Sequence, residues 1–257
     1  MITREQIHSL SQKKKMNEAT ILREYLQLFF LNELYSLKQS EKILFKGGTA
    51  LHFIYGAPRF SEDLDFTVEL TMNNFNKLIK ELFANIRKKE SITFKERKTI
   101  AGQRFLMTAL PTILPYQTFI NLDFSFREHI IQPQKSLIKI EDYPILFRSY
   151  IHHLSKEEIF AEKIRAVSTR TKGRDLYDLW YLLNIGANMN KELIKKKLRY
   201  YHLENIDNKK LIGKIKQFSQ KDFILDIRPF VPLNERNKLN DLFNYIQEYL
   251  MQNLKNL

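Results

Sequence analysis

Two carboxylates separated by one residue, Asp63 and Asp65, are the side chains of this sequence whose spacing most directly suggests chemistry. On an extended strand successive side chains point to opposite faces, so both acids share one face while Leu64 and Phe66 point into a core. Adjacent carboxylates repel each other, and a divalent cation relieves that repulsion most simply; Mg²⁺ suits an all-oxygen site completed by phosphates. Acid pairs of this spacing are common on surfaces, but the apolar neighbours indicate a buried strand, where unpaired carboxylates are costly.

Two glycines precede the acids, at a predicted turn from an apolar strand into a helix in the segment FKGGTAL. Without side chains, Gly47 and Gly48 let backbone N–H groups and the helix dipole approach a phosphate, although paired glycines are also ordinary turn chemistry. The Thr49 hydroxyl either contacts the phosphates or caps the helix. Arg59 would clamp phosphate and Ser61 would orient a carboxylate, unless both are loop surface. This layout predicts a nucleoside triphosphate site.

A third acid, Asp123, lies in the segment FINLDFSF, where apolar residues alternate with Asn121, Asp123 and Ser125. The alternation places one acid on the polar face of a core strand. On a strand next to the acid pair, Asp123 would complete the metal site and act as the base that takes the proton of an acceptor. A half-exposed antiparallel strand with one solvated aspartate explains the pattern equally well.

Two further groups of charges fall in the second half of the chain. Lys163 lies partly on the inward side of a helix predicted to begin at Ser155, although a lysine there often extends harmlessly to solvent. Arg174, Asp175 and Asp178 form a cluster in RDLYDLW at another helix start, where the dipole favours acids whatever they do.

The chain of 257 residues carries a formal net charge of +13, which favours polyanionic partners, with nucleic acid first among them. A lysine-rich composition bias is the alternative explanation. Nine basic residues against three acidic ones fall between Asn190 and Gln217, and we expect Lys195 to Lys197 to contact the acceptor. Cysteine is absent, no apolar run of about 18 residues or more occurs, and the N-terminal MITREQIHSLSQKKK has no apolar segment after its charges. We therefore expect a cytoplasmic protein with no membrane partner.

Periodicity divides the chain into two predicted domains of an α/β (α+β) protein: a mixed sheet with N-terminal helices over 1–150, and a helical domain over 151–257. The predicted strands are 42–46, 63–68, 91–98, 104–110 and 119–126, with helices at 49–55 and 72–88. The predicted helices of the second domain are 155–169, 174–184, 190–202, 206–218 and 234–254. The first of these starts with the spacing of a capping box, Ser155 and Glu158.

Taken together, these segments resemble the AbiEii/AbiGii-type toxins, a branch of the DNA polymerase β-like nucleotidyltransferases. Four blocks carry the resemblance: KGGTAL with RFSEDLDF, NLDF, EEIFAEKIRAV, and RDLYDL. They cover most of residues 40–185. The turn reads GGT where superfamily members often have GS, and the threonine keeps the hydroxyl.

The resemblance implies a role for each matching residue. Gly47, Gly48 and Thr49 would hold the triphosphate of an NTP, Asp63 and Asp65 would bind metal, Asp123 would be the third acid, Lys163 would contact phosphate, and Asp175 would be the essential acid of the last block. The implied activity is Mg²⁺-dependent transfer of a nucleotide to RNA, with tRNA as the acceptor expected for toxins of this type and a cognate antitoxin as partner. Transfer to a cationic small molecule such as an aminoglycoside is the first alternative, which the positive charge disfavours. A non-catalytic RNA-binding protein with the same fold is the second.

Overall fold

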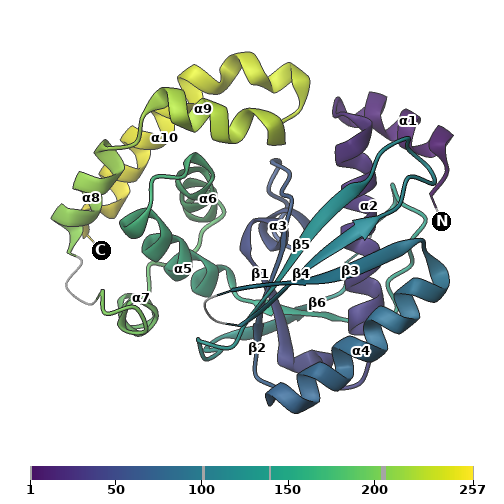
Figure 1. Cartoon of the computed structure of the whole chain (residues 1–257). Helices are drawn as coiled ribbons and strands as arrows, with labels where there is room; N and C mark the ends of the chain where they lie inside the picture. Colours follow the sequence, from purple (N-terminus) through teal and green to yellow (C-terminus); the bar gives the residue numbers. More distant parts are fainter. Residues whose placement is uncertain (1, 100–101, 139, 204–206, 257) are drawn as a thin grey trace. The chain divides into compact units, whose positions relative to one another are not determined.

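The computed structural model describes residues 2–99, 102–138, 140–203 and 207–256, and it divides into two compact units. The first unit comprises Met1–Gly56 and Phe60–Leu154. The second comprises Ser155–Leu257 together with the short segment Ala57–Arg59. Figure 1 labels the helices and strands of both units. In the described part of the chain, no helix combines the length and apolar character needed to cross a bilayer.

The first unit is built on one mixed seven-stranded sheet in the order β3-β4-β5-β2-β1-β7-β6, which confirms the predicted fold class. β1 and β2 pair antiparallel, whereas β2 and β5 pair parallel. Apolar and polar residues alternate along β2 and β5, so each strand has a buried face and a polar face. The strands are β1 (Ile43–Lys46), β2 (Leu64–Val68), β3 (Ile92–Arg97), β4 (Gln103–Ala109), β5 (Thr118–Ser125), β6 (Pro133–Ser136) and β7 (Ile151–Leu154).

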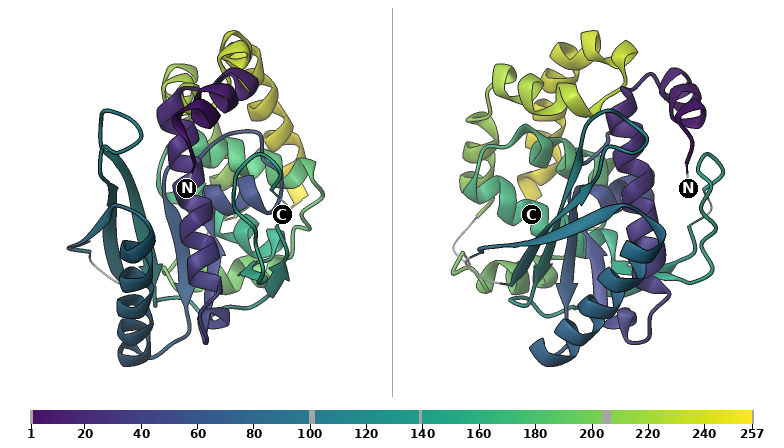
Figure 2. Two further views of the ribbon diagram at one scale, coloured as in Figure 1. Left: turned by 90° about the vertical axis from the view of Figure 1, so that its right-hand side faces the viewer. Right: turned by 45° about the vertical axis from the view of Figure 1, so that its right-hand side comes forward.

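Two long helices, α2 and α4, cover the apolar face of this sheet (Figure 2). Phe75 of α4 packs edge-on against Phe124 of β5, and Phe83 of α4 stacks on Phe94 of β3. Phe66 of β2 also stacks on Phe124. Side-chain caps start α1, α2 and α4, as expected for Thr and Asn before a helix. The helices of this unit are α1 (Arg4–Lys14), α2 (Glu18–Tyr35), the 3-10 turn η1 (Ser40–Lys42), α3 (Gly47–Phe53) and α4 (Met72–Lys89).

Two strands of the sheet, β6 and β7, were not predicted. β6 has the sequence PQKS, which is largely exposed and lacks any apolar alternation. β7 pairs parallel with β1, with Phe45 opposite His153. The Tyr35 hydroxyl of α2 lies 2.8 Å from the carbonyl oxygens of both Ile43 and His152, which share its single O–H donor, and this contact ties both strands to the helix. This pairing joins segments about a hundred residues apart, and no local pattern announces it.

The second unit is helical, as predicted for residues after Ser155. α9 was not predicted, and the long helix expected from 234 begins at Leu239, after the 3-10 turn Leu233–Lys238. Ile206, where one helix was expected to start, lies outside the described residues. The helices are α5 (Lys156–Thr169), α6 (Gly173–Asn184), α7 (Lys191–Arg199), α8 (Asn208–Lys216), α9 (Gln220–Ile227) and α10 (Leu239–Asn253), with 3-10 turns η2 (Arg228–Phe230), η3 (Leu233–Lys238) and η4 (Leu254–Asn256).

A buried lysine joins α5 to α7, and it corrects one expectation. Lys197 is 1% exposed, and its Nζ lies 2.7 Å from a carboxylate oxygen of Glu158 and 3.3 Å from one of Glu162. The predicted contact of Lys197 with an acceptor is therefore wrong, whereas Lys195 is exposed. Of the predicted capping box, the Ser155 hydroxyl accepts from the Glu158 backbone N–H at 3.1 Å, while the Glu158 carboxylate pairs with Lys197.

Candidate active site

The glycine turn lies directly against one acid of the pair. Gly47 begins α3 with φ of +78°, a conformation that favours glycine. A Cβ atom at this position would lie 2.3 Å from Asp65 Oδ2, so no larger residue fits without displacing the carboxylate. The turn and the second acid, which are well separated in the sequence, are thus packed against each other.

The third acid lies on the neighbouring strand in register with the pair. β2 and β5 are parallel, with Asp65 opposite Asp123. Asn121 donates through Nδ2 to Asp63 Oδ1 at 2.9 Å, which fixes the first acid. Leu64 and Leu122, between these polar positions, are fully buried. The structure therefore brings Asp63, Asp65 and Asp123 to one face of two adjacent strands.

Arg104 of β4 holds the third acid. Its Nε donates to Asp123 Oδ1, and the two residues lie opposite each other in the β4–β5 ladder. Burial raises the pKa of Asp123 above its ordinary value; Arg104 opposes this increase and the charge of Asp63 adds to it. The carboxylates of Asp63 and Asp123 on this face therefore repel each other.

Hydrogen bonds tie down the loop that leads into the acids. The Thr49 hydroxyl donates to the backbone carbonyl of Asp63, and Thr49 is 1% exposed. Gln27 Nε2 of α2 donates to the backbone carbonyls of Ser61 and Glu62 at 3.0 and 2.9 Å. In this structure the Thr49 hydroxyl positions the acid strand, and Ser61 contributes its backbone to the same support.

The donor set of this face fits a hard divalent cation, because it consists of carboxylate and amide oxygens. In the part of the chain that the structure describes, no three His, Cys, Asp or Glu side chains are arranged to hold a metal ion as they stand. Asp123 is bonded to Arg104, whereas Asp65 lies against the glycine turn and Asp63 is fixed by the Asn121 amide. The two acids of the pair are therefore the main candidates for metal ligands.

The predicted residues of the second unit form a network of ion pairs within that unit. Lys163 Nζ lies 2.9 Å from Asp175 Oδ1 and 2.7 Å from Asp178 Oδ2. Arg59 donates to both carboxylate oxygens of Asp178 at 2.6 Å, and Arg170 donates to Asp175 at 2.6 Å. Three cations thus surround two acids in the second unit. Arg59 was predicted to clamp phosphate; in the structure its guanidinium donates two hydrogen bonds to the Asp178 carboxylate instead.

This network favours the charged forms of Lys163 and Asp175. Burial disfavours the charged form of Lys163, but the charges of Asp175 and Asp178 outweigh it and raise the pKa of the lysine. Burial also acts against the Asp175 carboxylate, yet Lys163 and Arg170 hold its pKa well below the usual range. Lys163 retains 13% exposure of its side chain, so its ammonium is largely enclosed by acids.

Four residues that shape these clusters were not assigned a site role from the sequence: Asn121, Arg104, Arg170 and Asp178. Asp178 carried a signal, because it lies three residues after Asp175 and so shares a helix face with it. Asn121 carried one too, since it lies two residues before Asp123 on the same strand face. Arg104 and Arg170 reach their acids through pairings that local periodicity does not reveal.

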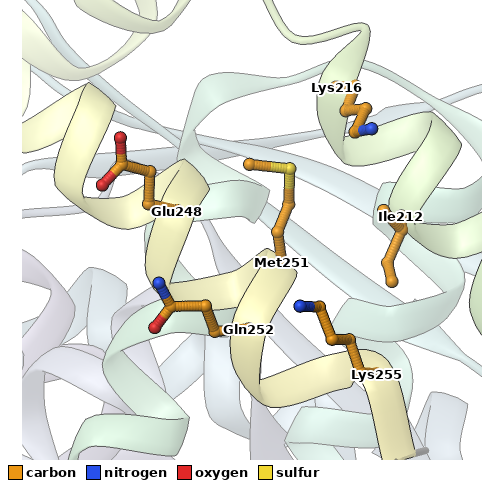
Figure 3. Close-up of a pocket in the computed structure, with 6 residues that line it drawn as sticks. All are labelled: Ile212, Lys216, Glu248, Met251, Gln252 and Lys255. Atoms are coloured by element: carbon orange, nitrogen blue, oxygen red, sulfur yellow. The ribbon is translucent and has the colours of Figure 1, made fainter.

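A hollow of about 300 Å³ in the second unit contains none of the predicted site residues. Figure 3 shows its lining on α8, α10 and the turn that follows: Ile212, Lys216, Glu248, Met251, Gln252 and Lys255. Its side chains mix charges of both signs with apolar groups, and they give no chemical indication of a specific ligand.

The packing of the glycine turn against Asp65 can be tested by adding one methyl group. We expect Gly47→Ala to lower the free energy of unfolding by about 1–2 kcal/mol, because alanine is strained at positive φ, and to reduce nucleotidyl transfer by displacing Asp65. Gly213→Ala is the control, since a Cβ there has nothing within 4 Å and replacing a helix glycine should add about 0.5–1 kcal/mol of stability. Urea unfolding and transfer assays on both variants provide the measurement. Full activity of Gly47→Ala would show that the turn does not fix the acid.

Comparisons with known proteins agree with this geometry. The sequence model of the family described as "Nucleotidyl transferase AbiEii toxin, Type IV TA system" matches residues 30–249. The fold is similar to that of JHP933 from Helicobacter pylori, with 20% identity, a TM-score of 0.53, and coverage of 93% of this chain and 95% of that one. It is also similar to MenT4, a nucleotidyltransferase toxin from Mycobacterium tuberculosis H37Rv, with 16% identity, a TM-score of 0.61, and coverage of 99% and 94%. No curated protein matches the chain by sequence.

Proposed function

We propose, on the premise that this chain belongs to the AbiEii family of nucleotidyl transferase toxins, that it moves a nucleoside monophosphate from an NTP to an RNA acceptor, tRNA being the expected one. Membership of the family makes the chain a nucleotidyltransferase of toxin–antitoxin type. The observation that carries the finer proposal is the packing of the Gly47 turn against Asp65, which faces Asp123 on the next strand. A phosphate-binding turn and carboxylates on one face are what phosphoryl transfer requires.

We assign Asp63 and Asp65 to Mg²⁺, with Asp123 as third acid. When bound, the ion would neutralise the triphosphate and orient it. Gly47 and Gly48 would let backbone N–H groups approach the phosphates, and the Asn121 amide holds Asp63 in place. The Asp123 carboxylate, whose pKa is raised by burial, would accept the proton of the attacking hydroxyl.

Residues of the ion-pair network take their proposed roles from the family resemblance. Lys163 would contact phosphate and Asp175 would be the essential acid. Arg59 and Arg170 support this proposal indirectly, because they keep the carboxylates of Asp178 and Asp175 paired with a cation when Lys163 binds a substrate.

The net charge supports a polyanionic acceptor. At +13, the chain attracts RNA and repels a cationic aminoglycoside. A toxin of this family also implies a cognate antitoxin, which we propose is encoded by a neighbouring reading frame. We place the protein and its proposed partners in the cytoplasm, where both tRNA and nucleotides are present.

Incubation of the purified protein with Mg²⁺, each of the four labelled NTPs and total tRNA tests the proposed activity. We expect label in the RNA from one nucleotide in preference to the others, and loss of labelling when EDTA removes the metal. An aminoglycoside offered in place of RNA is the control acceptor. Normal RNA binding without any labelling would contradict the transferase, and label in the aminoglycoside alone would contradict the RNA acceptor.

A further inference from the structure

A row of charged side chains crosses the sheet of the first unit at the level of the acids. Arg97 of β3 lies opposite Arg104 of β4, and Arg104 lies opposite Asp123 of β5. Asp123 lies opposite Asp65 of β2, and Asp65 lies opposite Lys46 of β1. Residues opposite each other point to the same face, so the row runs from two arginines through two aspartates to a lysine.

A hollow of about 580 Å³ lies at the arginine end of this row, and we call it the β3–β4 hollow. Four of its residues are basic and one is acidic. Lys95 shares the polar face because it is two positions from Arg97 on the same strand. The lining consists of Lys95, Glu96, Arg97, Lys98, Arg104 and Asn121.

The basic side chains of the hollow are short of partners. Like charges directly opposite each other destabilise a sheet, and the facing arginines of β3 and β4 are such a pair. Arg104 is bonded to Asp123. Among the residues that the structure describes, no side-chain hydrogen bond or ion pair engages Lys95, Arg97 or Lys98. A bound anion would remove the repulsion between the arginines and pair the remaining cations.

We propose that the β3–β4 hollow holds the phosphate chain of the acceptor RNA, an inference that rests on the proposed function. The triphosphate is assigned to the glycine turn after β1, and in the strand order the acids of β2 and β5 lie between that turn and the hollow. The acceptor and the nucleotide therefore reach the acids from opposite sides, as in-line displacement requires. Lys95 to Lys98 extend over about 10 Å of strand, which suits successive phosphates of a chain better than one compact triphosphate.

The test compares two sets of neutral variants on opposite faces of the same sheet. The first is Lys95→Gln with Arg97→Gln and Lys98→Gln. The control removes three exposed lysines of α4, the helix that covers the apolar face: Lys77→Gln, Lys80→Gln and Lys88→Gln. Total tRNA binding is measured by fluorescence anisotropy between about 50 and 200 mM salt without nucleotide, and NTP binding by calorimetry with Mg²⁺ and a non-hydrolysable analogue.

We expect the hollow variant to bind tRNA at least about tenfold more weakly, and the slope of log affinity against log salt to fall by roughly 0.7–0.9 for each phosphate that no longer pairs with a cation. NTP affinity should not change. An equal weakening of tRNA binding in the α4 variant would overturn the proposal, because it would show only non-specific attraction. Weaker NTP binding with tRNA binding intact would overturn it too. Failure of the native protein to label any RNA would refute the proposed function, whereas the binding comparison would still decide the role of the hollow.

Discussion

Asp65→Asn should reduce nucleotidyl transfer by at least about 10²–10³-fold while leaving the fold intact. Loss of one ligand that stabilises charge in the transition state costs several kcal/mol, and each 1.4 kcal/mol is a factor of ten. The fold should be retained, because asparagine has the size of aspartate and its amide oxygen still accepts hydrogen bonds. The melting temperature should therefore change little.

The control for this change is Glu62→Gln, the same substitution chemistry one residue before the pair. The Glu62 carboxylate is 43% exposed and lies 3.3 Å from Arg23, a surface ion pair that contributes little. We expect Glu62→Gln to keep transfer within about twofold of the native rate. Labelling of tRNA at saturating NTP and the arrest of growth on expression are the two readouts. An Asp65→Asn protein that labels RNA as fast as Glu62→Gln would refute the metal-binding role of the pair.

The largest expected loss of stability comes from Lys197→Met. Lys197 is 1% exposed and pairs with Glu158, which is fully buried, and with Glu162. Removal of the ammonium leaves two enclosed carboxylates without this ion-pair partner. Breaking such a buried pair lowers the free energy of unfolding by about 3–5 kcal/mol. Methionine keeps most of the volume, so the loss reports charge rather than packing. Urea unfolding followed by circular dichroism measures it.

Lys195→Met on the same helix provides the matched control. The Lys195 side chain is 65% exposed, and its nearest carboxylate oxygen, on Glu192, is 4.0 Å away. We expect its free energy of unfolding to change by less than about 0.5 kcal/mol. A further variant that combines Lys197→Met with Glu158→Gln and Glu162→Gln should recover part of the loss, because the enclosed charges are then gone. If Lys197→Met costs no more than Lys195→Met, the buried ion pairs do not hold α5 to α7.

Residue type and local spacing were enough to predict which strand faces carry the three acids. Alternation along β2 and β5 places Asp63, Asp65 and Asp123 on polar faces, because the two-residue period of a strand is a local property. The double glycine predicts a tight turn from residue type alone, and Gly47 has the positive φ that such a turn requires. The start of α5 was likewise predicted from the spacing of Ser155 and Glu158, and Ser155 is its N-cap.

The partners of the charged groups were decided only by tertiary structure. Asn121 reaches Asp63 across 58 positions, and Arg59 reaches Asp178 across 119. Lys197, which reads as one more surface lysine in a basic run, is enclosed by acids of α5. Strand order, register and burial set these pairings, and they follow from how the whole chain packs rather than from any local period. The sequence by itself therefore determined which groups could do chemistry and on which face they stand, whereas the folded chain decided which charges are free to meet a substrate, because an ion pair depends on proximity in space and not in sequence.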